Sequence, residues 1–161
     1  MFGKIFDNIQ EKDIEVRDID GNKYIRNLKN FRFRIGVYGL LINDNKILVQ
    51  THPYTKKYGL PGGAVDMGEM LEEALKREFI EETNLNIKVK NIFDVDEQFF
   101  TNPNFNEDAH SFFLFYKVEK ISGRLATNGN GDDVLEAKYV NPKDLNKGNT
   151  ERYVWKILKY L

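Results

Sequence analysis

Three glutamates at helical spacing are the residues of this chain best suited to chemistry. If residues 69–82 form a helix, Glu78, Glu81 and Glu82 fall within about 100 degrees of one another, because each residue turns a helix by about 100 degrees. The same sector holds apolar residues of that stretch, namely Leu71, Ala74 and Leu75. The carboxylates therefore continue the apolar stripe, and the helix is expected to turn its acidic cluster inward.

Carboxylates that are partly removed from water need a compensating cation. Each one without a partner costs on the order of 1 kcal/mol or more, whereas like charges in water cost only tenths of that. Arg77 supplies one positive charge against three negative ones. A divalent cation completes the balance, and ligation by oxygen alone favours Mg²⁺ or Mn²⁺ over zinc. The alternative is a solvated acidic face, which is the ordinary state of acid-rich helices.

The segment before this helix, Leu60-Pro61-Gly62-Gly63, contains two residues without a side chain. Gly62 and Gly63 let the backbone approach a ligand closely, and Pro61 fixes the direction of the chain. Backbone carbonyls at this point are additional candidate metal ligands. Taken alone, Pro-Gly-Gly is more often a simple turn. Its position just upstream of the acidic helix is what favours a role in binding.

The remaining pattern indicates the elements that must position the helix. Alternating apolar residues predict a β-hairpin, with strands at 31–41 and 47–50 and a turn at Asn43-Asp44-Asn45. Residues 14–16 and 23–25 fit either an edge hairpin or an irregular lead-in. Further elements are expected along the rest of the chain, namely strands at 87–94, 109–118 and 134–140 and a terminal helix at 150–161.

The spacing of residues around the helix resembles the Nudix box. That motif runs Gly, five residues, Glu, seven residues, Arg-Glu-apolar, one residue, Glu-Glu, one residue, Gly, apolar. Eight of its nine defined positions match over 23 residues, at Gly63, Glu69, Arg77-Glu78-Phe79, Glu81-Glu82 and Leu85. The mismatch is Asn84, where the family has Gly. Asn is the usual second choice for the left-handed residue that ends a helix, so the chemistry is expected to be intact.

The resemblance implies a fold and a reaction. The fold would be α/β, the Nudix fold, with a mixed β-sheet sandwiched between helices. Nudix hydrolases split a diphosphate linked to another moiety by water attack on phosphorus, with one to several Mg²⁺ or Mn²⁺ ions as cofactor. Nucleoside di- or triphosphates are the first expectation for the substrate, and ADP-ribose or another nucleotide-sugar is the alternative.

The resemblance also assigns roles to residues of the box. Glu78, Glu81 and Glu82 would be metal ligands together with the carbonyl of Gly62, and Glu78 is also a candidate base for the attacking water. Arg77 would orient the glutamates. Two readings stay open for the next residue of the motif, Glu69, which would be an outer acid of the site or a partner of the helix dipole.

Residues outside the box complete the expected site. Relatives often draw one more acid from a loop before a late strand, where Asp133 is the choice, with Glu97 as the competing candidate and a solvated turn as the alternative. Arg34 and Lys57 are favoured for binding substrate phosphates, because they lie on or beside elements that should border the site.

Composition limits the class of protein. The 161 residues contain no Cys, with 24 Lys and Arg against 25 Asp and Glu, so thiol enzymes and disulfide scaffolds are excluded and no strong net charge attracts nucleic acid or membrane. One domain over residues 1–161 is expected, with 1–30 as a lead-in of uncertain structure. We expect a small nucleotide as partner and a cytoplasmic location. A homodimer stays open, because paired subunits are common in the family.

A hypothesis from another class is a nucleotide- or RNA-binding module that keeps this fold without catalysis. In such a protein the basic segment 23–34 would contact backbone phosphates. A module of this kind would be expected to lose its acidic residues. All of them are present here, which favours an enzyme.

Overall fold

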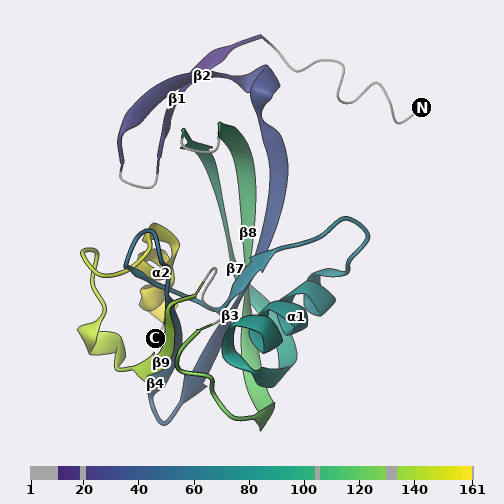
Figure 1. The fold of residues 1–161 in the computed structure, drawn as a ribbon, viewed down its shortest axis with the longest axis vertical. Helices are drawn as coiled ribbons and strands as arrows, with labels where there is room; N and C mark the ends of the chain where they lie inside the picture. Colours follow the sequence, from purple (N-terminus) through teal and green to yellow (C-terminus); the bar gives the residue numbers. More distant parts are fainter. Residues whose placement is uncertain (1–10, 19–20, 104–105, 130–133, 161) are drawn as a thin grey trace. The chain divides into compact units, whose positions relative to one another are not determined.

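A computed structural model describes residues 11–18, 21–103, 106–129 and 134–160 (Figure 1). Its chain divides into two compact units. Unit 1 comprises Met1–Arg34 and Glu97–Phe112, and unit 2 comprises Ile35–Asp96 and Phe113–Leu161. The expectation of one domain over the whole chain stays a prediction.

Unit 1 contains a hairpin near the amino terminus. Strand β1 (Asp13–Arg17) pairs with β2 (Lys23–Asn27) in antiparallel register, with Val16 opposite Tyr24. β1 also pairs in parallel with β7 (Leu85–Asn102), where Arg17 lies opposite Phe100. Of the two readings given for this segment, the edge hairpin is confirmed.

Unit 2 is built on the predicted central hairpin. Strand β3 (Arg32–Asn43) and β4 (Lys46–Thr51) are joined by Asp44 and Asn45, whose φ angles of 49° and 59° suit a tight hairpin turn. Strand β6 (Gly62–Ala64) pairs with β3. The remaining strands are β5 (Tyr58–Gly59) and β9 (Glu136–Val140), which both pair with β4, and β8 (Glu107–Gly123) between β7 and β3.

Two helices cover opposite faces of the sheet in unit 2 (Figure 1). Helix α1 (Leu71–Thr83) packs on one side and helix α2 (Arg152–Ile157) on the other. Neighbouring residues of one strand alternate between the two cores, as Leu48 packs with α1 while Ile47 and Val49 pack with α2. This arrangement confirms the predicted mixed sheet between helices.

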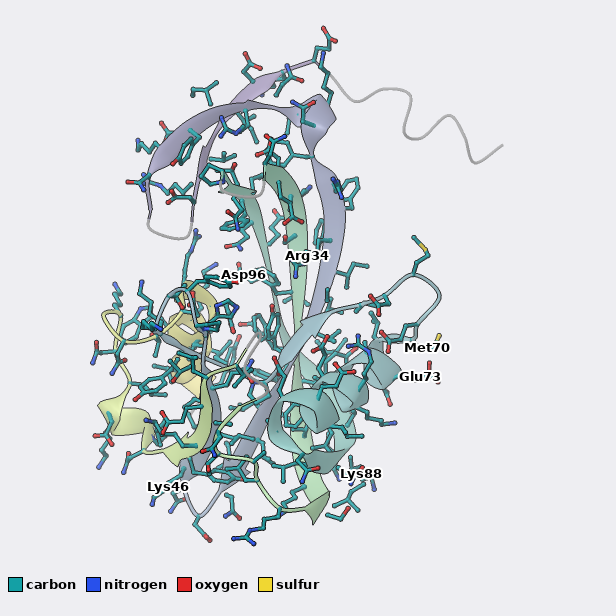
Figure 2. All side chains as sticks on the ribbon, in the orientation of Figure 1. Arg34, Lys46, Met70, Glu73, Lys88 and Asp96 are labelled. Carbon is teal, nitrogen blue, oxygen red and sulfur yellow. The ribbon has the colours of Figure 1, made fainter. Side chains whose placement is uncertain are left out.

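The helix boundaries differ from the predicted ones. Helix α1 begins at Leu71 instead of residue 69, and the Glu73 carboxylate accepts from the Met70 backbone N–H at 3.3 Å at its start (Figure 2). The terminal helix predicted for 150–161 is too long, because α2 covers only Arg152–Ile157 before a 3-10 turn. Glu151 is extended, with its N–H donated to the Tyr58 carbonyl, so the helix cannot begin earlier. No helix of the described residues is long and apolar enough to cross a membrane.

Helix α1 ends at Asn84, which has the predicted left-handed conformation with φ 57° and ψ 29°. Its backbone N–H donates to the Ile80 carbonyl, and its side-chain Nδ2 donates to the Arg124 carbonyl at 3.1 Å. The residue therefore stabilises the helix end in two ways, through the cap and through a link to the chain after β8.

The two roles of Asn84 lead to opposing effects in Asn84→Gly. Glycine relieves the left-handed backbone but loses the bond to Arg124, and each effect is about 1 kcal/mol, so the free energy of unfolding should stay within about 0.5 kcal/mol of the parent. Asn84→Ala loses both advantages and should destabilise by about 1–2 kcal/mol. Urea unfolding of the two variants checks the order, and a glycine variant less stable than the alanine variant would contradict this account.

Candidate active site

Helix α1 places the three predicted glutamates at different depths. Glu82 is buried, with 5% of the residue exposed, the Glu78 side chain is 14% exposed, and that of Glu81 is 53% exposed. The prediction that all three turn inward is wrong for Glu81. The buried side of α1 is formed by Ala74, Leu75, Phe79, Glu82 and Thr83. Measured around the axis of α1 at about 100 degrees per residue, the centre of this buried side lies about 60 degrees from Glu78 but about 120 degrees from Glu81.

Arg77 holds the outer part of this acidic cluster. Its guanidinium donates to both oxygens of Glu69, from Nε and Nη2, at 2.9 Å each. Nη1 donates to Glu78 Oε1 at 2.8 Å and to Glu81 Oε2 at 3.3 Å, and Nη2 also donates to the Ala64 carbonyl at 3.1 Å. One cation thus contacts three carboxylates, and the bonds to Glu69 and Glu78 raise the pKa of Arg77 above its ordinary value.

The Arg77 contact makes the Glu69 carboxylate sensitive to acid. Hydrogen bonds from Arg77 lower the pKa of Glu69 below its ordinary value of 4.5. A carboxyl whose pKa is depressed in the folded state adds stability above its unfolded pKa, and that contribution disappears as the pH falls through the folded value. We therefore expect the stability difference between the parent and Glu69→Gln to be full at pH 7 and to shrink below about pH 4.5. Urea unfolding over this pH range checks the trend, and a constant difference would contradict it.

Two uncharged donors hold the buried Glu82 carboxylate. The Gln50 side-chain Nε2 on β4 donates to Glu82 Oε1, and the Gly62 backbone N–H donates to Oε2, both at 2.8 Å. Gln50 is itself 7% exposed, and its Oε1 is buried without a hydrogen-bond partner among the described residues. An orphaned buried oxygen costs on the order of 1–3 kcal/mol, so this atom marks a position suited to a further donor or a cation.

Sequence reasoning missed Gln50 as a site residue. It follows the apolar run Ile47-Leu48-Val49 at the end of the strand predicted for 47–50. A polar side chain at the end of such a strand needs a partner in the interior. That requirement was the available signal, but the sequence does not say that the partner is Glu82.

The two glycines before α1 are required by close contacts, as their position suggested. A Cβ on Gly63 would lie 2.6 Å from Glu78 Oε1, and a Cβ on Gly62 would lie 2.1 Å from the Val37 carbonyl oxygen. Gly62 also has a φ of 137°, which side chains rarely allow. The backbone of β6 therefore lies directly against the carboxylates of α1.

The donor set fits a divalent cation with oxygen ligands. Within the described ranges no group of three or more His, Cys, Asp or Glu side chains is already placed to hold a metal ion, because Arg77 contacts Glu78 and Glu81 while Glu82 is bonded separately. The oxygens present nevertheless include a buried carboxylate and the unpartnered Gln50 Oε1 beside it. Oxygen donors of this kind match Mg²⁺ or Mn²⁺ better than zinc.

The residues predicted outside the box are distributed over the chain. Lys57 belongs to unit 2, in the loop before β5, whereas Arg34 lies on β3 in unit 1. Asp133 lies outside the described residues. Its competitor Glu97 belongs to unit 1, where its carboxylate lies 3.5 Å from the His110 imidazole. The roles of these residues stay predictions.

Comparisons with known proteins agree with the fold and the box. A family model described as the NUDIX domain matches residues 32–161. The ADP-ribose pyrophosphatase of Methanocaldococcus jannaschii is 34% identical over 129 residues, covering 76% of this chain and 72% of that protein. A Bacillus subtilis protein, provisionally described as an 8-oxo-dGTP diphosphatase, is 32% identical over 108 residues, covering 66% of each. The crystal structure of a MutT NUDIX hydrolase from Burkholderia pseudomallei has a TM-score of 0.64 and 24% identity, over 79% of this chain and 95% of that one.

The fold, the motif around α1 and the similarity to known proteins together show that this protein is an enzyme that hydrolyses phosphoric anhydrides. The chain belongs to the Nudix family. Nudix hydrolases generally use divalent metal ions, and their pyrophosphatase members act on small nucleotide substrates. The resemblance noted in the box is thereby confirmed.

Proposed function

We propose that this protein is a metal-dependent pyrophosphohydrolase that cleaves a diphosphate linkage of a nucleotide by water attack on phosphorus. The observation that supports this most directly is the buried Glu82 carboxylate, held by Gln50 and Gly62 at 2.8 Å each. Burying a carboxylate costs stability, and a purely structural helix gains nothing from it. A site that binds a cation accounts for the burial.

In this proposal the acidic residues of α1 have different roles. Glu78, Glu81 and Glu82, with the Gly62 carbonyl, would hold Mg²⁺ or Mn²⁺. A bound ion of this kind neutralises the diphosphate and lowers the pKa of a bound water. Glu78 would accept the proton of the attacking water, because its side chain keeps 14% exposure and its carboxylate lies against the Gly63 backbone.

Arg77 would act as a positioning residue. Its planar guanidinium contacts Glu69 through two parallel hydrogen bonds and Glu78 through a third. This geometry fixes the Glu78 carboxylate relative to the start of α1. Glu69 would then serve as the outer acid that anchors Arg77, which is the first of the two readings that the sequence left open.

Two substrate classes follow from the relatives. The 34% identical ADP-ribose pyrophosphatase favours ADP-ribose, and the Bacillus subtilis relative favours a nucleoside triphosphate. In both substrates a nucleoside is joined to a diphosphate, and Arg34 and Lys57 are proposed to bind the phosphates. Because the M. jannaschii match is longer and more similar, ADP-ribose is the first substrate to test.

The test is product formation from a panel of ADP-ribose, nucleoside triphosphates and dinucleotides, with Mg²⁺, with Mn²⁺ and with a chelator. We expect at least one of these substrate classes to be hydrolysed, and we expect this hydrolysis to require the metal. ADP-ribose should yield AMP and ribose phosphate, whereas a triphosphate should yield a nucleoside monophosphate and pyrophosphate. Absence of metal-dependent hydrolysis across all classes would overturn the proposal.

The additional acid has its own test. If Asp133 approaches a metal ion or the attacking water when substrate is bound, Asp133→Asn should lower turnover by about 10²-fold or more while its melting temperature stays near that of the parent. Glu97→Gln, at the competing candidate, is the control and should keep its activity. Loss of turnover in Glu97→Gln but not in Asp133→Asn would move the role to Glu97.

A further inference from the structure

A basic groove in unit 2 is a second feature that the proposed function does not explain. It has a volume of about 390 Å³ and is lined by Lys57, Lys147, Thr150, Arg152, Trp155 and Lys156. None of these described lining residues is acidic. A volume of this size is at the lower end of small-molecule sites.

The charges of the groove are largely uncompensated. In the part of the chain that the structure describes, the side chains of Lys57 and Arg152 form no ion pair or hydrogen bond, and Lys147 contacts only the Trp155 ring, at 5.3 Å from its centroid. Lys156 is paired with Asp96. The whole chain has a net charge of −1, so three unpaired cations around one cavity are a local concentration of positive charge.

A neighbouring cavity shows the contrast. It measures about 720 Å³, shares Trp155 and Lys156 with the groove, and is also lined by Asp94, Asp96 and Lys159. Its charges are balanced, because Asp96 pairs with Lys156 and Asp94 lies 3.8 Å from Lys159 (Figure 2 labels Asp96). Of these two cavities among the described residues, the smaller groove is the one that presents cations without an ion-pair partner.

Backbone contacts hold the groove in shape. The Tyr58 N–H donates to the Asn149 carbonyl at 2.8 Å, and the Glu151 N–H donates to the Tyr58 carbonyl at 2.9 Å. These bonds fix the chain next to Lys57 against the chain next to Arg152. The Glu151 carboxylate accepts from the Thr55 hydroxyl and forms no ion pair with a groove cation among the described residues.

The loop that carries Lys147 is also fixed. The Asn149 side chain donates to the Asp144 carbonyl at 2.8 Å and accepts from the Asn146 N–H at 2.8 Å. The buried Thr150 donates its hydroxyl to the Asn146 carbonyl at 2.7 Å. The cationic side chains are therefore attached to a backbone that is held by hydrogen bonds, which limits the entropy lost when a ligand binds.

We propose that this groove binds a nucleoside phosphate without needing the metal site of α1. Arg152, Lys147 and Lys57 would contact the phosphate, since guanidinium and ammonium groups form strong hydrogen bonds with phosphate oxygens. The indole of Trp155, whose residue is 40% exposed, offers a planar apolar surface for the base. A ligand with both an anionic group and an aromatic ring uses every feature of the groove.

The chain carries its own probe for this proposal, because Trp155 is its only tryptophan. Tryptophan emission is titrated with AMP in the presence of a chelator, with free tryptophan amide as a correction for absorbed light. We expect a saturable change in emission. We also expect inorganic phosphate and adenosine to bind more weakly than AMP, because each engages only part of the groove.

Matched variants locate the binding. Arg152→Gln and Lys147→Gln should each weaken AMP binding by about tenfold, whereas Lys143→Gln, which removes an equal charge outside the groove, should bind as the parent does. Glu82→Gln should also bind AMP normally, so a failed hydrolysis assay and a failed titration have separate meanings. The movement of the Trp155 indole N–H signal in NMR is a second readout.

Several results would overturn the proposal. These are the absence of a saturable emission change and of an indole shift, equal weakening by Lys143→Gln, unchanged binding in both groove variants, or inorganic phosphate binding as tightly as AMP. The last result would mean that the aromatic ring has no part in the site.

Discussion

Glu82→Gln is expected to lower turnover by several orders of magnitude while leaving the metal-free protein as stable as the parent, or more stable. The loss of turnover follows from the proposed removal of a metal ligand. With Mg²⁺ or Mn²⁺ present, the order of stability should reverse. A ligand that binds the folded state adds RT ln(1 + [L]/Kd), and only the intact site obtains that gain.

The contacts of Glu82 explain why the metal-free variant should be stable. Its carboxylate is buried and accepts from Gln50 and Gly62. The substituted amide still has an oxygen for the Gly62 N–H, and its NH₂ group can donate to Gln50 Oε1, which has no partner among the described residues, once the Gln50 amide turns over. The variant thereby removes a buried charge and keeps one hydrogen bond between the two side chains, while the unpartnered position passes from Gln50 Oε1 to its Nε2.

The measurement is a pair of melting curves for each protein, one with metal and one with chelator, together with the hydrolysis assay. Glu72→Gln is the matched control on the same helix, since Glu72 is exposed and lies 4.0 Å from Lys76. It should show neither the reversal nor the loss of activity. A parent without metal-dependent stabilisation, together with undiminished hydrolysis in Glu82→Gln, would refute the assignment.

Arg77→Met should give the largest loss of stability among these variants. The substitution removes five hydrogen bonds and leaves Glu69 and Glu78 without their cation. Hydrogen bonds to charged groups are worth about 1.5–3 kcal/mol, and partial exposure reduces the sum, so the free energy of unfolding should fall by about 2–3 kcal/mol. Urea unfolding at pH 7 measures the change, and turnover should fall as well, because Glu78 loses its orientation.

Two further substitutions separate the charge of Arg77 from its shape. Arg77→Lys keeps the charge but cannot form the paired bonds to both oxygens of Glu69, so it should recover only part of the stability. Lys76→Met removes an adjacent exposed charge and should change stability by less than about 1 kcal/mol. If Arg77→Met were no more destabilising than Lys76→Met, the cluster would be a solvated surface feature.

The spacing of the box could be read from the sequence because it is a local property of one helix. The positions of Arg77 and Glu82 follow from helical geometry, and the left-handed end at Asn84 follows from its residue type. The exposure of Glu81 did not follow, since it depends on which side of α1 meets the sheet. The apolar stripe in the sequence located the buried side of α1 only to within about a quarter of a turn around the helix axis.

Contacts between distant segments were beyond sequence reasoning. Gln50 and Glu82 are separated by 32 residues, and nothing in either local pattern indicates the other. The same holds for the end of the chain, where pairing of Tyr58 with Thr150 keeps Glu151 extended and shortens the terminal helix. Helix propensity predicted residues 150–161 as one helix, and a tertiary contact overrode it.

The contact between Leu60 and Tyr153 also bears on how the protein forms during synthesis. The Tyr153 hydroxyl accepts from the Leu60 N–H across 93 residues of chain, and it lies 2.7 Å from where a Cβ on Gly59 would be. The strand that leads into Gly62 and Gly63 is therefore braced by a residue that is synthesised long after it. Contacts of such separation close large loops and form slowly. The acidic helix can fold from local contacts, but the backbone that faces it is braced only after Tyr153 has been synthesised.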